Sequence, residues 1–105
     1  MYRPLPESLT IKQSGIDGLG LFAKEDIAQG HNLGMTHIKL NGNILRTPLG
    51  GFINHSNAPN VVKVELLMTN EGNIRRFDYK KWNLITLRNI KKGEELTVRY
   101  TFYNV

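Results

Sequence analysis

Cysteine is absent from the 105 residues, which excludes a disulfide framework, a thiolate metal site and a cysteine nucleophile. The sequence also has no apolar run near the roughly 20 residues that a membrane-spanning helix needs. Its N-terminus lacks the apolar stretch of a secretory signal peptide, and no long window repeats apolar residues at helical spacing. We therefore expect a soluble, intracellular protein that meets no membrane, is stabilised by packing alone and contains no long helix.

The residues that are present suit one small globular domain. Hydrophobic residues make up 40% of the chain and charged residues 22%, which is enough to fill a core in a protein of 12.0 kDa. We expect residues 1–105 to form this single domain. Residues 1–7 are expected to form an extended arm, because Pro4 and Pro6 restrict the backbone there.

Positive charge is concentrated toward the C-terminus. The net charge is +5, and residues 70–105 contain eight basic and four acidic side chains, against six and five in residues 1–69. A basic surface of this kind can meet an acidic protein or a phosphate group. Because the charges are spread over several expected strands, the pattern favours an ordinary solvated surface over a nucleic-acid interface.

Short alternating segments bounded by glycine predict β-strands. Asn41-Gly42 is typical of a two-residue type I′ turn and predicts a hairpin, and a second hairpin is expected around residues 69–73. One helical turn is expected near residues 47–52. The fold class is therefore all-β, with seven or eight strands. The expected strands are residues 9–13, 19–23, 37–40, 43–46, 61–68, 74–79, 82–87 and 95–100.

Two segments of five residues echo each other. Residues 26–30 and 89–93 each begin with Asp or Asn, continue with Ile and end with Gly. We expect both to be tight turns in which the first side chain caps its own turn, the isoleucine enters the core and the glycine adopts a left-handed conformation.

Gly18-Leu19-Gly20 lies between the first two expected strands. Small residues at such a place let the backbone approach a ligand closely. No helix and no third glycine follow, so the segment is not a dinucleotide-binding fingerprint. On local grounds alone a plain turn is favoured.

Residues 50–60 are unusual because three asparagines, a histidine and a serine accompany Phe52 and Ile53. This composition predicts a buried polar loop in which Asn54 can offer both a donor and an acceptor to a ligand. Ser56 lies in no nucleophile elbow, so a serine hydrolase is not predicted.

The three histidines, His31, His37 and His55, lack the spacing and the paired carboxylates of a metal site, and we predict no metal. Beyond the last expected strand, Tyr100, Phe102 and Tyr103 form an aromatic cluster. Taken alone these residues favour a core role, although a tyrosine hydroxyl in an apolar slot can orient or polarise an amine.

Taken in order, three segments resemble the SET-domain protein lysine methyltransferases, and the small size is most similar to the minimal viral and phage SET proteins. The segments are Gly18-Leu19-Gly20-Leu21-Phe22-Ala23, Phe52-Ile53-Asn54-His55-Ser56 with Pro59-Asn60, and Gly93-Glu94-Glu95-Leu96-Thr97 with Tyr100. The resemblance implies a β-clip of small curved sheets, with a knot-like crossing of the C-terminal segment.

The same resemblance implies a cofactor, a substrate and residue roles. S-adenosylmethionine would be the cofactor, with no metal, and the ε-amine of a lysine in a histone or non-histone protein would accept the methyl group. Tyr100 would be the catalytic residue that holds the amine in line. The residues expected to bind the cofactor are Gly18, Leu19, Gly20, Asn54 and His55.

The sequence departs from the family's pattern near its end. Arg99 stands where an acidic residue is common, and the cysteine-rich post-SET segment that often closes the site is absent, as is any pre-SET segment. Phe102, Tyr103 or a second subunit of a homodimer would then supply the lid. Gly51 and Asn57 also stand where the family often has arginine and cysteine.

Two functions follow from these observations. The first is methyl transfer to a protein lysine, with nucleic acid not expected as a direct substrate. The alternative is a catalytically silent SET-like module that binds an acidic protein or nucleic acid through the basic C-terminal third. Local acidic side chains, with Glu71, Glu94 and Glu95 as candidates, would have to attract a basic substrate to a protein that is itself basic.

Overall fold

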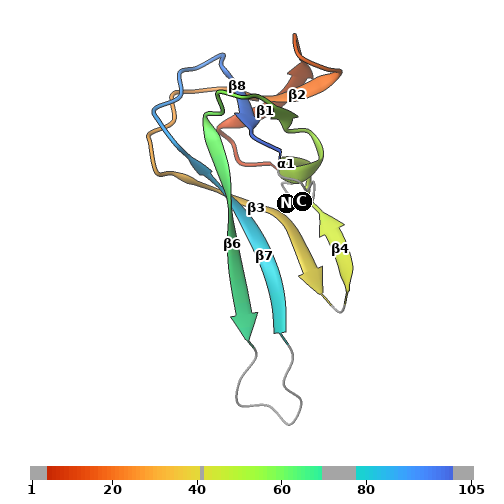
Figure 1. The fold of residues 1–105 in the computed structure, drawn as a ribbon. Helices are drawn as coiled ribbons and strands as arrows, with labels where there is room; N and C mark the ends of the chain where they lie inside the picture. Colours follow the sequence, from red (N-terminus) through yellow and green to blue (C-terminus); the bar gives the residue numbers. More distant parts are fainter. Residues whose placement is uncertain (1–4, 41, 70–77, 101–105) are drawn as a thin grey trace.

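Two four-stranded sheets and one short helix make up the fold in a computed structural model that describes residues 5–40, 42–69 and 78–100 (Figure 1). The smaller sheet has the strand order β1-β2-β8-β5. The larger sheet, which contains the three longest strands, has the order β4-β3-β7-β6. This confirms the predicted mainly β class with a single helical turn. The elements are β1 (Leu9–Gln13), β2 (Leu19–Ala23), β3 (Asn32–Leu40), β4 (Asn43–Arg46), α1 (Pro48–Gly51), β5 (Asn54–His55), β6 (Val61–Thr69), β7 (Asp78–Thr86) and β8 (Glu95–Val98).

The predicted strands at residues 9–13 and 19–23 form an antiparallel hairpin, with Leu9 opposite Ala23 and Gln13 opposite Leu19. The hairpin between β3 and β4 is confirmed as well, although β3 begins earlier than predicted. Asn41, the first residue of its expected turn, lies outside the described residues. The helical turn α1 follows β4 directly, begins with Pro48 and buries Leu49.

The strands predicted at residues 74–79 and 82–87 are a single strand within the described residues. The predicted strands left a gap at residues 80 and 81, but β7 runs without interruption through both. Backbone pairing with β3 on one side and β6 on the other holds this segment extended. Lys80 meets Glu65 of β6 at 3.3 Å on the exposed surface. The predicted loop at residues 70–73 and residues 74–77 lie outside the described residues.

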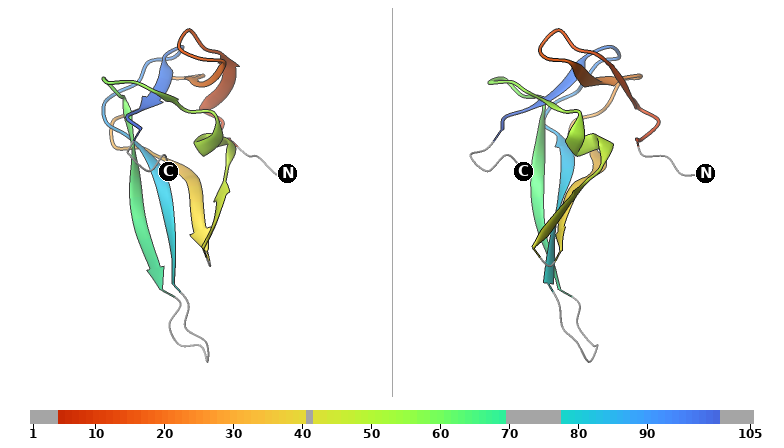
Figure 2. Two further views of the ribbon diagram at one scale, coloured as in Figure 1. Left: turned by 45° about the vertical axis from the view of Figure 1, so that its right-hand side comes forward. Right: turned by 90° about the vertical axis from the view of Figure 1, so that its right-hand side faces the viewer.

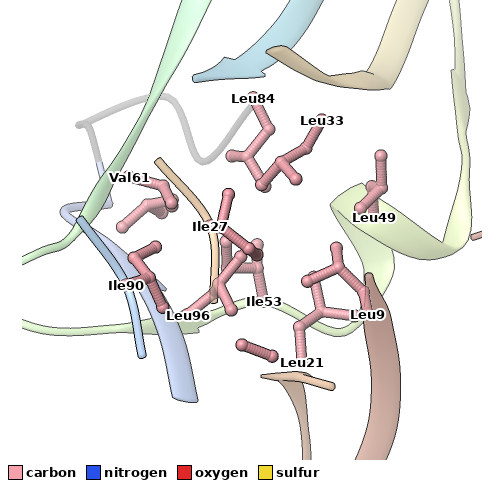
Figure 3. Close-up of a cluster of buried hydrophobic side chains, with 12 residues drawn as sticks. Leu9, Leu21, Ile27, Leu33, Leu49, Ile53, Val61, Leu84, Ile90 and Leu96 are labelled. Carbon is pink, nitrogen blue, oxygen red and sulfur yellow. The ribbon is translucent and has the colours of Figure 1, made fainter. Parts of the chain in front are cut away.

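The hydrophobic core lies where the two sheets meet. Leu84 and Leu33 enter it from the larger sheet, Leu21 and Leu96 enter it from the smaller sheet, and Ile53 lies between them (Figure 3). The long strands of the larger sheet project away from this junction (Figure 2). Since Ile53 immediately precedes β5, burial of its side chain fixes the position of the polar residues that follow it.

The two echoing segments are tight turns that face each other. Ile27 and Ile90 exchange a pair of backbone hydrogen bonds of 2.8 Å, and both side chains are buried. Gly30 and Gly93 adopt φ angles of 79° and 92°, as predicted.

The prediction that the first side chain of each segment caps its own turn is wrong. Asp26 accepts a hydrogen bond from the Lys92 amide, and Asn89 accepts one from the Gln29 amide, both at 2.8 Å. Each side chain therefore caps the opposite turn, because the isoleucine pairing brings the two turns together.

In the described part of the chain, no helix has the length and apolar character needed to cross a membrane.

Candidate functional site

A parallel pairing between β5 and β8 organises the candidate site. Asn54 lies opposite Thr97 and His55 opposite Val98. Residues so far apart in sequence reach each other because β8 lies between β2 and β5 in the smaller sheet. Residues 50–60 were predicted to be a buried polar loop. Within them, Asn54 and His55 instead form a two-residue strand with half-buried side chains.

Asn60 attaches the end of this segment to β8 from within the protein. Its side chain is buried, donates to the backbone oxygen of Glu95 at 2.8 Å and accepts from the amide of Thr97 at 2.8 Å. A buried amide group that satisfies both partners in this way fixes the register of the strand it holds. Asn54 and Tyr100, at the two ends of the site, are thereby held relative to each other.

Tyr100 follows β8 and lies against the start of β5. Its hydroxyl donates to the backbone oxygen of Ile53 at 2.7 Å, and its backbone amide donates to Nδ1 of His55 at 2.8 Å. The two rings are 5.1 Å apart between centroids and tilted by 50°. With 44% of its surface exposed, Tyr100 remains accessible to a ligand.

His55 is held in one tautomer by its partners. Because Nδ1 accepts the Tyr100 amide, the ring hydrogen belongs on Nε2, which lies 3.2 Å from the Asn57 side-chain oxygen and can donate to it. His55 therefore connects Asn57 with the backbone of Tyr100. This contact was not anticipated from the sequence, where the resemblance implied only that His55 binds the cofactor.

The Asn54 side chain points toward the turn between β1 and β2. Its Nδ2 group donates to the backbone oxygens of Asp17 and Leu19 at 3.1 and 3.3 Å and to Oε2 of Glu95 at 2.9 Å. Among the described residues no donor reaches its Oδ1. The amide is therefore oriented so that its acceptor is the atom left for another molecule.

The Gly18-Leu19-Gly20 segment adjoins Asn54, as the resemblance implied. Gly18 has a φ of 44° at the end of the turn, and Leu19 is 51% exposed. Gly20 leaves space for its neighbours, since a Cβ atom there would displace the Glu95 carboxylate and come within 3.1 Å of Nδ2 of Asn54. The structure thus brings together Gly18, Leu19, Gly20, Asn54, His55 and Tyr100, while their roles remain predictions.

Ser14 and Glu95 complete the site, and sequence reasoning missed both as members of it. The Ser14 hydroxyl lies 2.8 Å from each carboxylate oxygen of Glu95. Glu95 was named in a motif segment and as a candidate to attract a basic substrate, but not as a site residue, and Ser14 was not singled out. Its place before a glycine in a turn gave no signal that it would meet a residue 81 positions away in the sequence.

Other predicted residues have different positions. The Arg99 side chain donates to the backbone oxygen of Asn57 at 2.7 Å, and Gly51 is exposed at the end of α1. Glu94 forms an ion pair with Arg88 at 2.8 Å, so its charge is already balanced. Phe102 and Tyr103, the predicted lid residues, and Glu71 lie outside the described residues.

The three histidines lie in separate surroundings. His31 is exposed, and His37 is buried against Trp82, with ring centroids 4.2 Å apart and planes inclined by 16°. Burial, with the positive charges of Lys63 and Arg46, lowers the pKa of His37 to about 4. No group of three or more potential metal ligands occurs among the described residues.

The fold and this arrangement define a class of small, mainly β proteins in which a short parallel strand pair brings an Asn-His dipeptide beside a tyrosine near the C-terminal end. The SET domain family matches residues 35–101, which is more than half of the chain. The chain therefore belongs to the SET domain family.

Solved structures show the same fold. A proposed histone methyltransferase of Plasmodium falciparum is similar over 93% of this chain and 96% of its own, with 19% identity and a TM-score of 0.63. A humanized mutant of the Chaetomium thermophilum Polycomb Repressive Complex 2, bound to an inhibitor, is similar over 89% of this chain and 14% of its own, with 22% identity and a TM-score of 0.57. No curated protein matches the sequence. These matches give no support to the narrower resemblance to viral and phage SET proteins.

Proposed function

We propose that this SET domain protein transfers a methyl group from S-adenosylmethionine to the ε-amine of a lysine in a protein substrate. The observation that carries the proposal is the parallel β5–β8 pairing, which holds the Asn54 amide and the Tyr100 hydroxyl in one site. Membership of the SET family supports the reaction class. The substrate is assigned by class only, as a lysine of a histone or of another protein.

The residues present fit the cofactor. The Oδ1 atom of Asn54 accepts no hydrogen bond from the described residues, and the Asn54 side chain adjoins the Gly18-Leu19-Gly20 segment, in which Leu19 is about half exposed. Asn54, the backbone of His55 and the Gly18-Leu19-Gly20 segment would hold S-adenosylmethionine, which supplies an activated methyl group when it is bound. The remaining contribution of the protein is to position and orient the substrate amine.

Tyr100 is the residue that would orient the substrate amine. Its hydroxyl hydrogen is directed to the Ile53 carbonyl, so the lone pairs of Oη are left to accept a hydrogen from an amine. An amine oriented through its N–H group keeps its own lone pair free for attack. This orientation would come from neutral groups, which would require no change of charge in the protein during the reaction.

A binding experiment tests the cofactor site. Calorimetric titration with S-adenosylmethionine should give saturable binding to the wild-type protein, and Asn54→Ala should weaken it about tenfold or more because a buried polar contact is lost. Asn43→Ala, which removes an exposed asparagine from β4, is the matched control and should bind like wild type. Equal affinities for wild type and Asn54→Ala would reject the role of Asn54.

A turnover experiment tests the reaction. Histone and non-histone proteins incubated with the enzyme and S-adenosylmethionine should gain mass in steps of one methylene on lysine, detected by mass spectrometry. Cofactor binding without methyl incorporation into any protein pool would instead support the catalytically silent module. In that case, binding to an acidic protein or nucleic acid should weaken as salt is raised.

A further inference from the structure

Glu95 is a half-buried carboxylate whose hydrogen-bond partners are all neutral. Its side-chain oxygens receive the Ser14 hydroxyl at 2.8 Å and the Asn54 amide at 2.9 Å. These neutral donors hydrogen-bond to the carboxylate without cancelling its negative charge. Among the described residues, no Lys, Arg or His forms an ion pair with Glu95.

The charged groups around Glu95 do not supply a cation. Lys12 lies opposite Gly20 in the register of β1 and β2, but its ammonium group lies over the Phe22 ring, 5.9 Å from the centroid. Asp17 contacts Asn54 through its backbone oxygen, which adds no positive charge there. Arg88 is engaged by Glu94. The candidate cofactor site is therefore negatively charged within a protein that is positive overall.

The backbone fixes where this charge lies. Gly20 leaves the space that the Glu95 carboxylate fills, since a Cβ atom at position 20 would collide with it. The Ser14 hydroxyl lies 2.8 Å from both carboxylate oxygens, and the Asn54 amide donates to Oε2. A carboxylate that is packed and hydrogen-bonded in this way cannot turn to solvent without breaking both contacts.

We propose that Glu95 is a specificity-determining residue that makes the site prefer the cationic cofactor over its neutral product. The inference rests on the proposed function. In the reaction the sulfur–methyl bond breaks as the nitrogen–carbon bond forms, so the sulfonium becomes a neutral thioether and the positive charge passes to the methylated amine. A fixed negative charge at the site attracts the sulfonium and gives no such attraction to S-adenosylhomocysteine. The charge of Glu95 thereby favours cofactor loading and product release.

The test compares two ligands that differ mainly in this charge. Dissociation constants for S-adenosylmethionine and S-adenosylhomocysteine are measured by calorimetry in the wild-type protein, in Glu95→Gln and in Glu65→Gln. Glutamine has nearly the same shape and can still accept from Asn54 and donate to the Ser14 oxygen. Glu65, an exposed partner of Lys80 on the larger sheet, controls for the change in net charge.

We expect the wild-type protein and Glu65→Gln to bind S-adenosylmethionine more tightly than S-adenosylhomocysteine. In Glu95→Gln, this preference for S-adenosylmethionine should fall about tenfold. A ratio that is unchanged in a folded Glu95→Gln protein overturns the inference while leaving the proposed function in place. Failure of the wild-type protein to bind either ligand overturns the proposed function, and the inference with it.

A second measurement needs no variant. The wild-type preference for S-adenosylmethionine should shrink as ionic strength rises from about 0.05 to about 0.5 M, because mobile ions screen the carboxylate. A preference that stays constant over this range contradicts an electrostatic origin. Thermal unfolding without ligand adds a further check, since Glu95→Gln removes an unbalanced charge and should leave the midpoint unchanged or raise it.

Discussion

The hydroxyl of Tyr100 donates a hydrogen bond to the backbone oxygen of Ile53 at 2.7 Å, which ties the end of β8 to the residue that introduces β5. Since the hydroxyl has one hydrogen, this bond determines that Oη presents only lone pairs to a substrate. The Tyr100 backbone is held separately by His55.

Tyr100→Phe should therefore remove nearly all methyl transfer. We expect the turnover rate to fall about 100-fold or more, because the group that orients the amine is lost. Cofactor affinity should change little, since Asn54 and His55 keep their other contacts. The two readouts are mass-spectrometric turnover and calorimetric binding of S-adenosylmethionine. Turnover at the wild-type rate would remove Tyr100 from the mechanism.

Asn60 supports the site from the core, and its loss should show as instability. Asn60→Ala leaves the Thr97 amide and the Glu95 carbonyl without their partner, and we expect a loss of about 2–3 kcal/mol in the free energy of unfolding. Urea denaturation followed by circular dichroism measures this loss. Asn43→Ala, at an exposed site, should change the same quantity by less than about 0.5 kcal/mol. Equal effects of the two substitutions would show that the buried amide does not hold β8.

The crossed caps of the two facing turns predict energetic coupling. Asp26→Ala and Asn89→Ala should each destabilise by about 1 kcal/mol, since each removes one side-chain acceptor from a backbone amide. Because each side chain caps the turn that carries the other, the double variant should deviate from additivity by about 0.5 kcal/mol or more. A double-mutant cycle by chemical denaturation measures the deviation, and strict additivity would show that the turns are independent.

His37 predicts a loss of stability on acidification. Its pKa in the folded protein, about 4, lies below the ordinary value of 6.5 because burial and the charges of Lys63 and Arg46 disfavour the charged ring. The unfolded chain therefore binds the proton first as pH falls, so stability should decrease from about pH 6.5 down to about pH 4. The total loss of stability from this group is roughly 3 kcal/mol, since each pKa unit corresponds to about 1.4 kcal/mol.

Unfolding free energies measured across this interval in wild type and His37→Phe provide the test. Phenylalanine can still stack on Trp82 but does not titrate, so the slope in this interval should become shallower. His31→Gln, which removes an exposed histidine, should leave the wild-type slope in place. A slope that is identical in wild type and His37→Phe would show that another group is responsible.

Much of the local structure could be predicted from sequence because local rules govern it. Short segments bounded by glycine predicted β1 and β2, Asn41-Gly42 predicted the β3–β4 hairpin, and one helical turn was expected near residues 47–52, where α1 lies. The three ordered segments indicated the SET family, which the match over residues 35–101 confirms. The gap left between strands at residues 80–81 was wrong, because pairing with β3 and β6 keeps β7 extended through both residues.

Only the tertiary structure decided how the site is assembled. The sequence supplies Asn54, Gly20 and Tyr100, but the β5–β8 pairing places them together, and no local pattern specifies a contact between strands so far apart in the chain. Ser14 and Glu95 became part of the site for the same reason, because β1 and β8 both flank β2 in one sheet. The sequence determined which chemical groups are available, and long-range packing decided which of them meet, since hydrogen bonds between distant residues form only after the core has fixed the strands.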